Sequence, residues 1–384
     1  MNPWQIGNTT IRNPYRLREG MRALSVSPLV GNLLGKTQQS AFAELLHYED
    51  VLVLDRIGTG QDFSDTGRKW HAALVQLGFL TPLLSSLSKI DASGIDPVLA
   101  AYQTGFVGLT GRPFEITPNG RRLIGAESIA AQQEVFLRAL LSYQIPSSAE
   151  KGGKIAPVAF SPLRVVLKTL TRMVKAGLDP HISYEEFTLF VQFATDETTL
   201  NAVIANIGSY RTDKAAATNK KGFYRQHLEV VTSTTEGHGG KPLQTDTVNT
   251  YTNCTLRYLK ASGLFTDKGR GIMIADEKQK LVDQILARPF IALGTTDPQA
   301  YLENLWNGAA LPTDEQDKGI EVILGYVEII RARGGTVELP KLSQMSKEDL
   351  SARRLDLEEQ LRFIYEEDYA ERQKDEWQDI HATC

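Results

Sequence analysis

Apolar residues recur at helical spacing along most of the chain, and short extended runs interrupt them. Between residues 62 and 125 the pattern predicts a helix over 64–77, strands over 78–80 and 114–117, and a further helix from Arg121. The order helix, strand, strand, helix is the outline of a winged helix-turn-helix module.

The same outline returns later in the chain. Residues 245–286 predict a helix, a strand, a tight turn over 267–271, a second strand and a closing helix. LVQLGFLT at 74–81 and YLKASGLFT at 258–266 share a helix end, a glycine, an apolar strand and a threonine. Two diverged copies of one module are therefore expected.

Two amphipathic helices, over 183–193 and 196–210, are expected to complete the helical half of the second copy. Ser183 and Glu186 have the spacing of a capping box, which predicts the start of the first of them.

Composition shifts divide the chain. Residues 145–157 are rich in Pro, Gly and Ser and mark a domain boundary, whereas 211–241 predicts a long, basic, partly mobile insertion. Beyond Pro289 the pattern is helical, and 346–380 predicts one helix on the order of 50 Å long, more stalk than core. We expect a mainly α (α+β) fold in three parts: winged-helix-like subdomains at 1–150 and 151–290, and a helical linker at 291–384.

The composition is that of a globular protein, with 384 residues, 42% hydrophobic and 23% charged. No apolar run approaches the roughly 18 residues of a membrane helix, and the polar N-terminus lacks the features of a secretory signal. A cytoplasmic protein without membrane contact is expected. Two cysteines, Cys254 and Cys384, and six scattered histidines predict neither a disulfide framework nor a metal motif.

The net charge of −4 argues against a polyanionic partner, but the charge is unevenly distributed. Residues 1–36 carry five basic side chains against one acidic, a local +4, and 151–260 carry fourteen against nine, a local +5. Residues 341–384 carry seven against twelve, a local −5. An acidic tail therefore masks a basic front, which favours a nucleic-acid partner.

A winged helix places one helix in the major groove of duplex DNA and its wing against phosphate. Arg and Lys donate to guanine or phosphate, and Asn pairs bidentately with adenine. For each helix the alternative is a solvated surface face, and for the N-terminal arm it is an extension that covers the first helix. The candidate contacts are Arg68, Lys69 and His71; Asn119, Arg121 and Arg122; Lys220, Lys221 and Arg225 in the insertion; Thr245, Thr247, Asn249, Thr250, Asn253 and Arg257; Lys268 and Arg270 in the hairpin; and Thr9, Thr10, Arg12, Asn13 and Arg16 in the arm.

A metal-dependent nuclease needs carboxylates beside a strand that bears a lysine. Asp267, Asp276 and Lys278 approach this pattern. Asp276, however, stands where the next helix needs an N-cap, so the structural interpretation is preferred and no catalytic residue or bound metal is predicted.

Seven segments, taken in order, carry a family resemblance. They are TTIRNPYRLREGMRAL, GRKWHAALVQLGFLTP, FEITPNGRRLIGAES, FLRALLSYQIPS, SPLRVVLKTLTRM, SYEEFTLFVQFATDET and TLRYLKASGLF. Over most of residues 1–290 the chain resembles the AlwI family of type IIS restriction endonucleases and its nicking relatives. The resemblance implies two winged-helix-like recognition subdomains, a helical linker and a nuclease domain. That nuclease domain uses Mg²⁺ to cut duplex DNA at a fixed offset from a short asymmetric site.

The resemblance places the nuclease strands, Pro-Asp with Glu-x-Lys or Glu-x-Thr, after the linker, and no strand-rich segment follows the linker before Cys384. We therefore expect a recognition fragment, or a chain whose nuclease is missing or provided in trans, binding its asymmetric site as a monomer. Mg²⁺ would belong to the associated nuclease. Two alternatives stay open: a non-enzymatic winged-helix regulator that dimerises through its C-terminal helix, and a complete nuclease that works through Asp267, Asp276 and Lys278.

Overall fold

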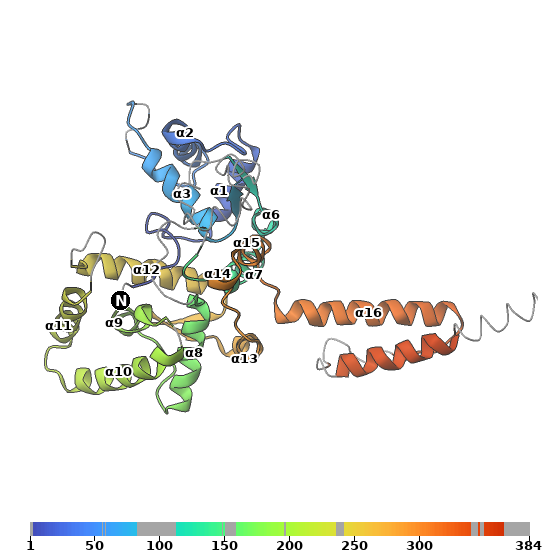
Figure 1. Cartoon of the computed structure of the whole chain (residues 1–384). Helices are drawn as coiled ribbons and strands as arrows, with labels where there is room; N and C mark the ends of the chain where they lie inside the picture. The colour runs from blue at the N-terminus through green and yellow to red at the C-terminus, as the bar shows by residue number, and fades with distance from the viewer. Residues whose placement is uncertain are drawn as a thin grey trace, which may run out of the picture. The chain divides into compact units, whose positions relative to one another are not determined.

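The computed structural model is mainly helical, as the sequence predicted, and divides into two compact units, Met1–Ala309 and Ala310–Cys384 (Figure 1). No helix in the part of the chain that it describes is long and apolar enough to cross a membrane. The described residues are 3–55, 57, 59–82, 113–147, 149, 159–195, 197–235, 242–338, 345 and 349–364.

Unit 1 contains helices and two short antiparallel ladders. The ladders pair β1 (Leu80–Pro82) with β2 (Phe114–Ile116), and β3 (Phe265–Lys268) with β4 (Gly271–Ile274). The helices are α1 (Arg16–Val26), α2 (Gly35–Tyr48), α3 (Ser64–Gln76), α6 (Pro118–Gly125), α7 (Ile129–Ser142), α8 (Pro162–Lys175), α9 (Tyr184–Leu189), α10 (Glu197–Ala216), α11 (Lys220–Ser233), α12 (Thr245–Ala261), α13 (Gln279–Ala287), α14 (Leu293–Thr296) and α15 (Pro298–Asn307), with the 3₁₀ turns η1 (Val191–Phe193) and η3 (Asp276–Lys278).

The first ladder lies between α3 and α6, in the predicted order. Leu80 pairs with Ile116, and Asn32 forms an isolated antiparallel bridge with Pro113 beside β2. Helix α6 begins three residues earlier than the sequence pattern predicted. Thr117 is its N-cap, because the Thr117 hydroxyl accepts the Gly120 N–H at 2.9 Å and a proline occupies the first helical position.

The second ladder follows α12 and precedes η3 and α13. Phe265 pairs with Ile274 in its register. Ile182 forms a bridge with Ile272, with N–H···O distances of 3.0 and 2.9 Å. The capping box at Ser183 is confirmed, since the Glu186 carboxylate accepts the Ser183 N–H at 2.8 Å.

The described part of 211–241, which the sequence predicted to be a long, basic, partly mobile insertion, is mostly helical. Helix α10 continues to Ala216, and α11 packs against α9 and α12. The rings of Phe223 and His227 lie in contact, tilted by 43°, with centroids 4.2 Å apart, and Leu228 is buried. These side chains lie at helical spacing, so burial of one face of α11 orders a stretch whose composition is polar.

Unit 2 is a pair of helices, α16 (Pro312–Ala332) and residues 349–364. Apolar residues at helical spacing on the second of these helices, Leu350, Leu357 and Leu361, are buried and pack against Ile323 and Val327 of α16. The expectation of a stalk helix with nothing to pack on is therefore wrong over 349–364. Trp377 and Ile380, which the sequence placed on that helix, lie outside the described residues.

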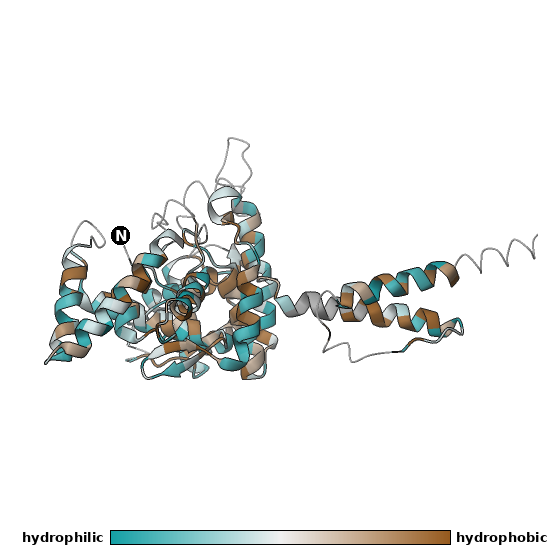
Figure 2. Ribbon diagram, turned by 90° about the horizontal axis from the view of Figure 1, so that it is seen from below, coloured by the Kyte–Doolittle hydropathy of each residue, from teal (hydrophilic) through white to brown (hydrophobic). Residues whose placement is uncertain are grey.

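The alternation of hydrophilic and hydrophobic residues along the helices is visible in Figure 2. In α8 the apolar residues form one buried face that includes Leu163, Val166 and Leu170. An amphipathic helix stabilises a fold chiefly through such a buried stripe, at roughly 25 cal/mol for each Å² of apolar surface removed from water.

Candidate nucleic-acid interface

Helix α12 has one buried and one polar face. Val248, Leu256 and Leu259 pack into the core. The polar face, partly or fully exposed, carries Thr247, Asn249, Thr250, Asn253 and Arg257.

Asn249 is held by two tyrosines that the sequence pattern did not single out. The Tyr224 hydroxyl donates to Asn249 Oδ1 at 2.7 Å, and the Tyr184 hydroxyl lies 2.8 Å from the Asn249 carbonyl and 3.3 Å from Oδ1. Burial raises the pKa of Tyr224 to about 12, so the hydroxyl stays protonated and donates. Because Oδ1 already accepts these bonds, Asn249 does not offer a free acceptor and donor pair to adenine in this conformation.

Arg257 connects α12 to the N-terminal segment. Its Nη1 donates to the Arg12 carbonyl at 3.1 Å, and its Nε donates to Asn253 Oδ1 at 3.2 Å. Neither Arg12 nor Arg257 forms an ion pair with an acidic side chain in the part of the chain that the structure describes. Two predicted DNA-contacting regions, the arm and the helix, therefore meet at one positively charged surface.

The predicted arm is anchored and lies against the core. Ile11 is buried, while Thr9 is partly exposed and Thr10, Arg12, Asn13 and Arg16 are exposed. Asn13 Oδ1 accepts the Tyr15 N–H at 3.2 Å, and Arg16 Nη1 donates to the Val51 carbonyl at 2.5 Å. The exposed arm residues thus extend from a fixed backbone.

On α3 the exposed residues lie in the first half of the helix. Arg68 and Lys69 both contact the Asp65 carboxylate, at 2.5 and 2.6 Å. Hydrogen bonds from Lys69 and then Arg68 are the main causes that hold the pKa of Asp65 below its usual value. These pairs are solvent-exposed, so they contribute little to stability, and both cations remain accessible to a ligand.

His71, predicted as a DNA contact on the same helix, lies in the core. It is 1% exposed, its ring centroid lies 5.8 Å from that of Phe114, and neither ring nitrogen has a hydrogen-bond partner in the structure. Burial lowers the pKa of His71 to about 4, so the ring is neutral at pH 7. The helical turn places residue 71 on the same side as Trp70 and Leu74, which removes it from the candidate surface in this conformation.

The candidates beyond the first ladder separate by exposure. Arg121 and Arg122 are exposed, and Arg122 donates to the Asn307 carbonyl. Asn119, considered with them in the sequence, is fully buried, and its side-chain nitrogen and oxygen have no partner in the structure. Its place in the first turn of α6 directs it towards the core beside Gly308.

The basic residues predicted in the insertion lie together at the start of α11. Lys220, Lys221 and Arg225 are exposed, and none forms an ion pair among the described residues. Lys221 and Arg225 are four residues apart and share a face of the helix. This end of α11 is therefore a second exposed basic surface.

In the hairpin, the two predicted cations have different surroundings. Lys268 pairs with Asp179 at 2.8 Å, with both side chains largely exposed. The Arg270 guanidinium lies over the ring of Tyr184, 4.0 Å from its centroid, in a cation–π contact. Arg270 is thereby held near the polar face of α12, through the tyrosine that also contacts Asn249.

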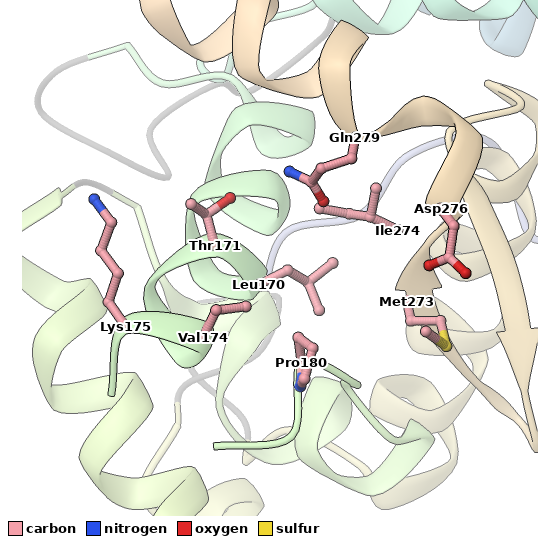
Figure 3. Close-up of a pocket in the computed structure, with 9 residues that line it drawn as sticks. All are labelled: Leu170, Thr171, Val174, Lys175, Pro180, Met273, Ile274, Asp276 and Gln279. Atoms are coloured by element: carbon pink, nitrogen blue, oxygen red, sulfur yellow. The ribbon is translucent and has the colours of Figure 1, made fainter. Parts of the chain in front are cut away.

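A pocket of about 260 Å³ lies between α8, β4 and the start of α13 (Figure 3). Its lining is mainly apolar, with Leu170, Val174 and Ile274, while Asp276 and Lys175 come from opposite sides. Asp267, the other predicted carboxylate, pairs with Lys260. No group of three or more His, Cys, Asp or Glu side chains that could hold a metal ion occurs among the residues that the structure describes.

Most of the chain matches a known protein family, since the model of the AlwI restriction endonuclease family matches residues 75–383. The chain belongs to this family. The AlwI family match starts at the end of α3 and includes both ladders, α12 and unit 2, so the resemblance inferred from the seven segments is confirmed.

No curated protein matches this AlwI family member. Among solved structures, one neighbour is the binding domain of the BpuJ1 endonuclease, in complex with pyrene- and phenanthrene-modified DNA. The alignment has 12% identity and a TM-score of 0.45, and it covers 76% of this chain and 90% of the other.

Proposed function

We propose that unit 1 contains two winged helix-turn-helix modules that recognise duplex DNA. The observation that carries the proposal is a repeated order of elements. The first copy runs α1, the bridging residue Asn32, α2, α3, β1 and β2, and the second runs α8, the bridging residue Ile182, α9, α12, β3 and β4. Helix, strand, helix, helix, strand, strand is the winged-helix order, in which the third helix reads the major groove.

This alignment of the two copies revises the role of α10, which the sequence pattern assigned to the helical half of the second module. Helix α8 takes that place, and α10 with α11 becomes an insertion between the second and third helices. The third helices are then α3 and α12, and both present polar side chains outward.

Base reading is assigned to the exposed parts of these two helices. On α12, Thr250 and Asn253 occupy the polar face, and on α3, Arg68 and Lys69 extend from the first turns. Arg is suited to guanine and Asn to adenine, and each such pair discriminates by about 1–3 kcal/mol.

Phosphate contacts are assigned to the exposed cations around the two helices. Arg12 and Arg257 form one group, and Lys221 and Arg225 form another at the start of α11. Each cation that neutralises a phosphate releases counterions, which makes binding weaken with salt.

We further propose that this recognition serves a type IIS restriction or nicking endonuclease that cuts outside a short asymmetric site. Two unlike modules in one chain suit such a site, and a monomer is sufficient to bind it. Mg²⁺ would act in the associated nuclease, whether on the same protein or in trans, in a cytoplasmic restriction–modification system. The described residues do not form a metal cluster, so the metal has no assigned ligands here.

The direct test is selection of bound duplexes from a random library by the purified protein. The selection is run at two salt concentrations with Mg²⁺, and the recovered DNA is checked for new ends. We expect one short asymmetric motif. Enrichment of no motif would refute DNA recognition, and a palindrome bound by a dimer would favour the regulator hypothesis.

Variants separate base reading from phosphate binding. Asn253→Ala is expected to reduce discrimination at one position by about 1–3 kcal/mol. Lys221→Ala is expected to weaken all duplexes equally and to lower the slope of log K against log salt by about 1. Lys280→Ala is the matched control, because Lys280 is exposed on α13, outside the proposed surface. An equal effect of Lys280→Ala would contradict the assignment.

A further inference from the structure

Residues 4–7, here named the strap, cross the interior of unit 1 from the second proposed module to the first. Trp4 is fully buried, and its Nε1 donates to the Ala194 carbonyl at 2.8 Å while its N–H donates to the Gln192 carbonyl at 2.9 Å. Its ring meets Phe187 of α9 edge to face, with centroids 5.6 Å apart. The strap therefore starts in the core of the second module.

The other end of the strap contacts both proposed recognition helices. The Ile6 N–H donates to Thr255 Oγ1 of α12 at 3.1 Å. The Gly7 N–H donates to Gln76 Oε1, on the last residue of α3, at 2.8 Å. Consecutive peptide groups thus bond one helix each, and one short piece of backbone connects α3 with α12.

Gly7 is required for this connection. Its φ is +78°, a conformation that residues with a Cβ rarely adopt, and a Cβ there would overlap the ring of Tyr258, a fully buried residue of α12. Gln76 is 5% exposed, and its Nε2 donates to the Tyr143 hydroxyl at 3.1 Å, so its carboxamide is held on both sides. The joint is close-packed and leaves the two helices little room to shift.

A shift of one helix matters for reading a continuous DNA site. One base pair advances the duplex by about 3.4 Å and rotates it by roughly 34°. Two recognition helices therefore read one fixed motif only if the distance between them varies by much less than the length of one base-pair step.

We propose that the strap, through Gly7 and Gln76, fixes the separation of α3 and α12 and thereby sets the number of base pairs between the bases that each module reads. This inference rests on the proposed DNA recognition for its consequence. Its mechanical part, the fixed separation of the helices, is independent of DNA.

The mechanical part is tested first, without DNA. Spin labels are placed at Asp65→Cys on α3 and Asp246→Cys on α12, both exposed, in a Cys384→Ser background. Cys254 is buried, and burial raises the pKa of its thiol to about 12, so it escapes labelling. We expect a narrow distance distribution in this protein and a distribution at least about twice as wide when Gly7→Ala is added.

Gly177→Ala is the matched control. Gly177 has φ +70°, but nothing lies within 4 Å of a Cβ at that position, so the variant adds the same backbone strain without touching the joint. Gln76→Leu removes the bond to the Gly7 N–H and is the second test variant, which keeps the proposal testable even if Gly7→Ala does not fold. If the spin-label distance distribution in both joint variants is as narrow as in Gly177→Ala, the proposal is overturned, whether or not the variants bind DNA.

The consequence is tested by duplex selection with unlabelled protein. Wild type and Gly177→Ala are expected to enrich one motif and to bind a site with one inserted base pair about 10-fold less tightly. Gly7→Ala is expected to enrich the same bases, but with a variable number of base pairs between the two parts of the motif. One inserted base pair should then weaken its binding by less than about 2-fold. If both joint variants, Gly7→Ala and Gln76→Leu, enrich a motif with the same fixed number of base pairs as wild type, the proposal is contradicted. Failure of wild type to enrich any motif refutes DNA recognition instead, and the spin-label distances alone then decide whether the strap fixes the two helices.

Discussion

Acidification to pH 5 should destabilise unit 1 through one buried side chain, His71. The imidazole is 1% exposed, packs beside Phe114 and has no hydrogen-bond partner for either nitrogen in the structure. Desolvation is the cause that lowers the pKa of His71 from 6.5 to about 4. Between these two values the unfolded chain binds a proton that the folded chain does not, so the free energy of unfolding falls as pH falls through this window.

The magnitude follows from the two pKa values. The pKa of His71 is 6.5 in the unfolded chain and about 4 in the folded chain. Between pH 7 and pH 5 this difference lowers the free energy of unfolding by about 2 kcal/mol, and below pH 4 the total loss is about 3 kcal/mol. A domain of this size shifts its melting temperature by about 2–4 °C for each kcal/mol. Asp62 and Asp65 also have lowered pKa values, but their contributions are lost only below about pH 4, outside the pH 5–7 window.

The assay is urea denaturation of wild type and His71→Leu at pH 7 and pH 5, followed by tryptophan fluorescence. Wild type should lose about 2 kcal/mol more than the variant between the two pH values, because every other titrating group is common to both proteins. At pH 7 the variant should retain DNA binding, unlike Arg68→Ala, since leucine fills an interior position. Equal losses in the two proteins would show that His71 is not buried as a neutral ring, and the reasoning would be refuted.

Three further predictions concern other parts of the chain. Asn249→Ala should lower the free energy of unfolding by about 1–2 kcal/mol, because the Tyr224 hydroxyl loses its part-buried acceptor, whereas Asn253→Ala should change it by less than about 0.5 kcal/mol; urea titrations of both compare them. Leu357→Ala should destabilise unit 2 by about 2–5 kcal/mol, seen as faster amide exchange in α16 with unchanged protection in α12, and equal acceleration in both helices would contradict the division into units. Arg225→Ala should reduce the salt slope of duplex binding by about 1 without changing the enriched motif, as measured by fluorescence anisotropy at several salt concentrations.

Local patterns predicted the elements that depend on neighbouring residues. The polar face of α12 and the buried positions 248, 256 and 259 follow from a period of 3.6 residues, and the start of α9 follows from the capping box at Ser183. The order helix, ladder, helix was also predicted correctly around both ladders, because turn residues and apolar runs mark these elements directly.

Where tertiary packing decides, predictions from local patterns were wrong. Residues 211–241 were expected to form a partly mobile insertion because basic, Gly and Ser/Thr residues are frequent there, yet Phe223 and Leu228 of α11 pack against side chains of α9 and α12. The helix at 349–364 was expected to stand alone, because nothing in its own stripe reveals that Ile323 and Val327 match it. Both errors came from judging a segment by composition without knowing what lies beside it.

From residue type alone, every Arg and Lys of the candidate surface is equally able to bind phosphate. The structure distinguishes them by the partners that their side chains already contact. Arg68 and Lys69 share the Asp65 carboxylate, so a phosphate must compete with an existing partner. Lys221 and Arg225 form no ion pair among the described residues, and a phosphate meets no such competition there. Exposed ion pairs are weak, so Arg68 and Lys69 remain available for base reading. Directional hydrogen bonds to the bases would then replace their bonds to the Asp65 carboxylate. Most of the salt dependence of binding is therefore expected from the start of α11 and from Arg12, and most of the sequence preference from α3 and α12.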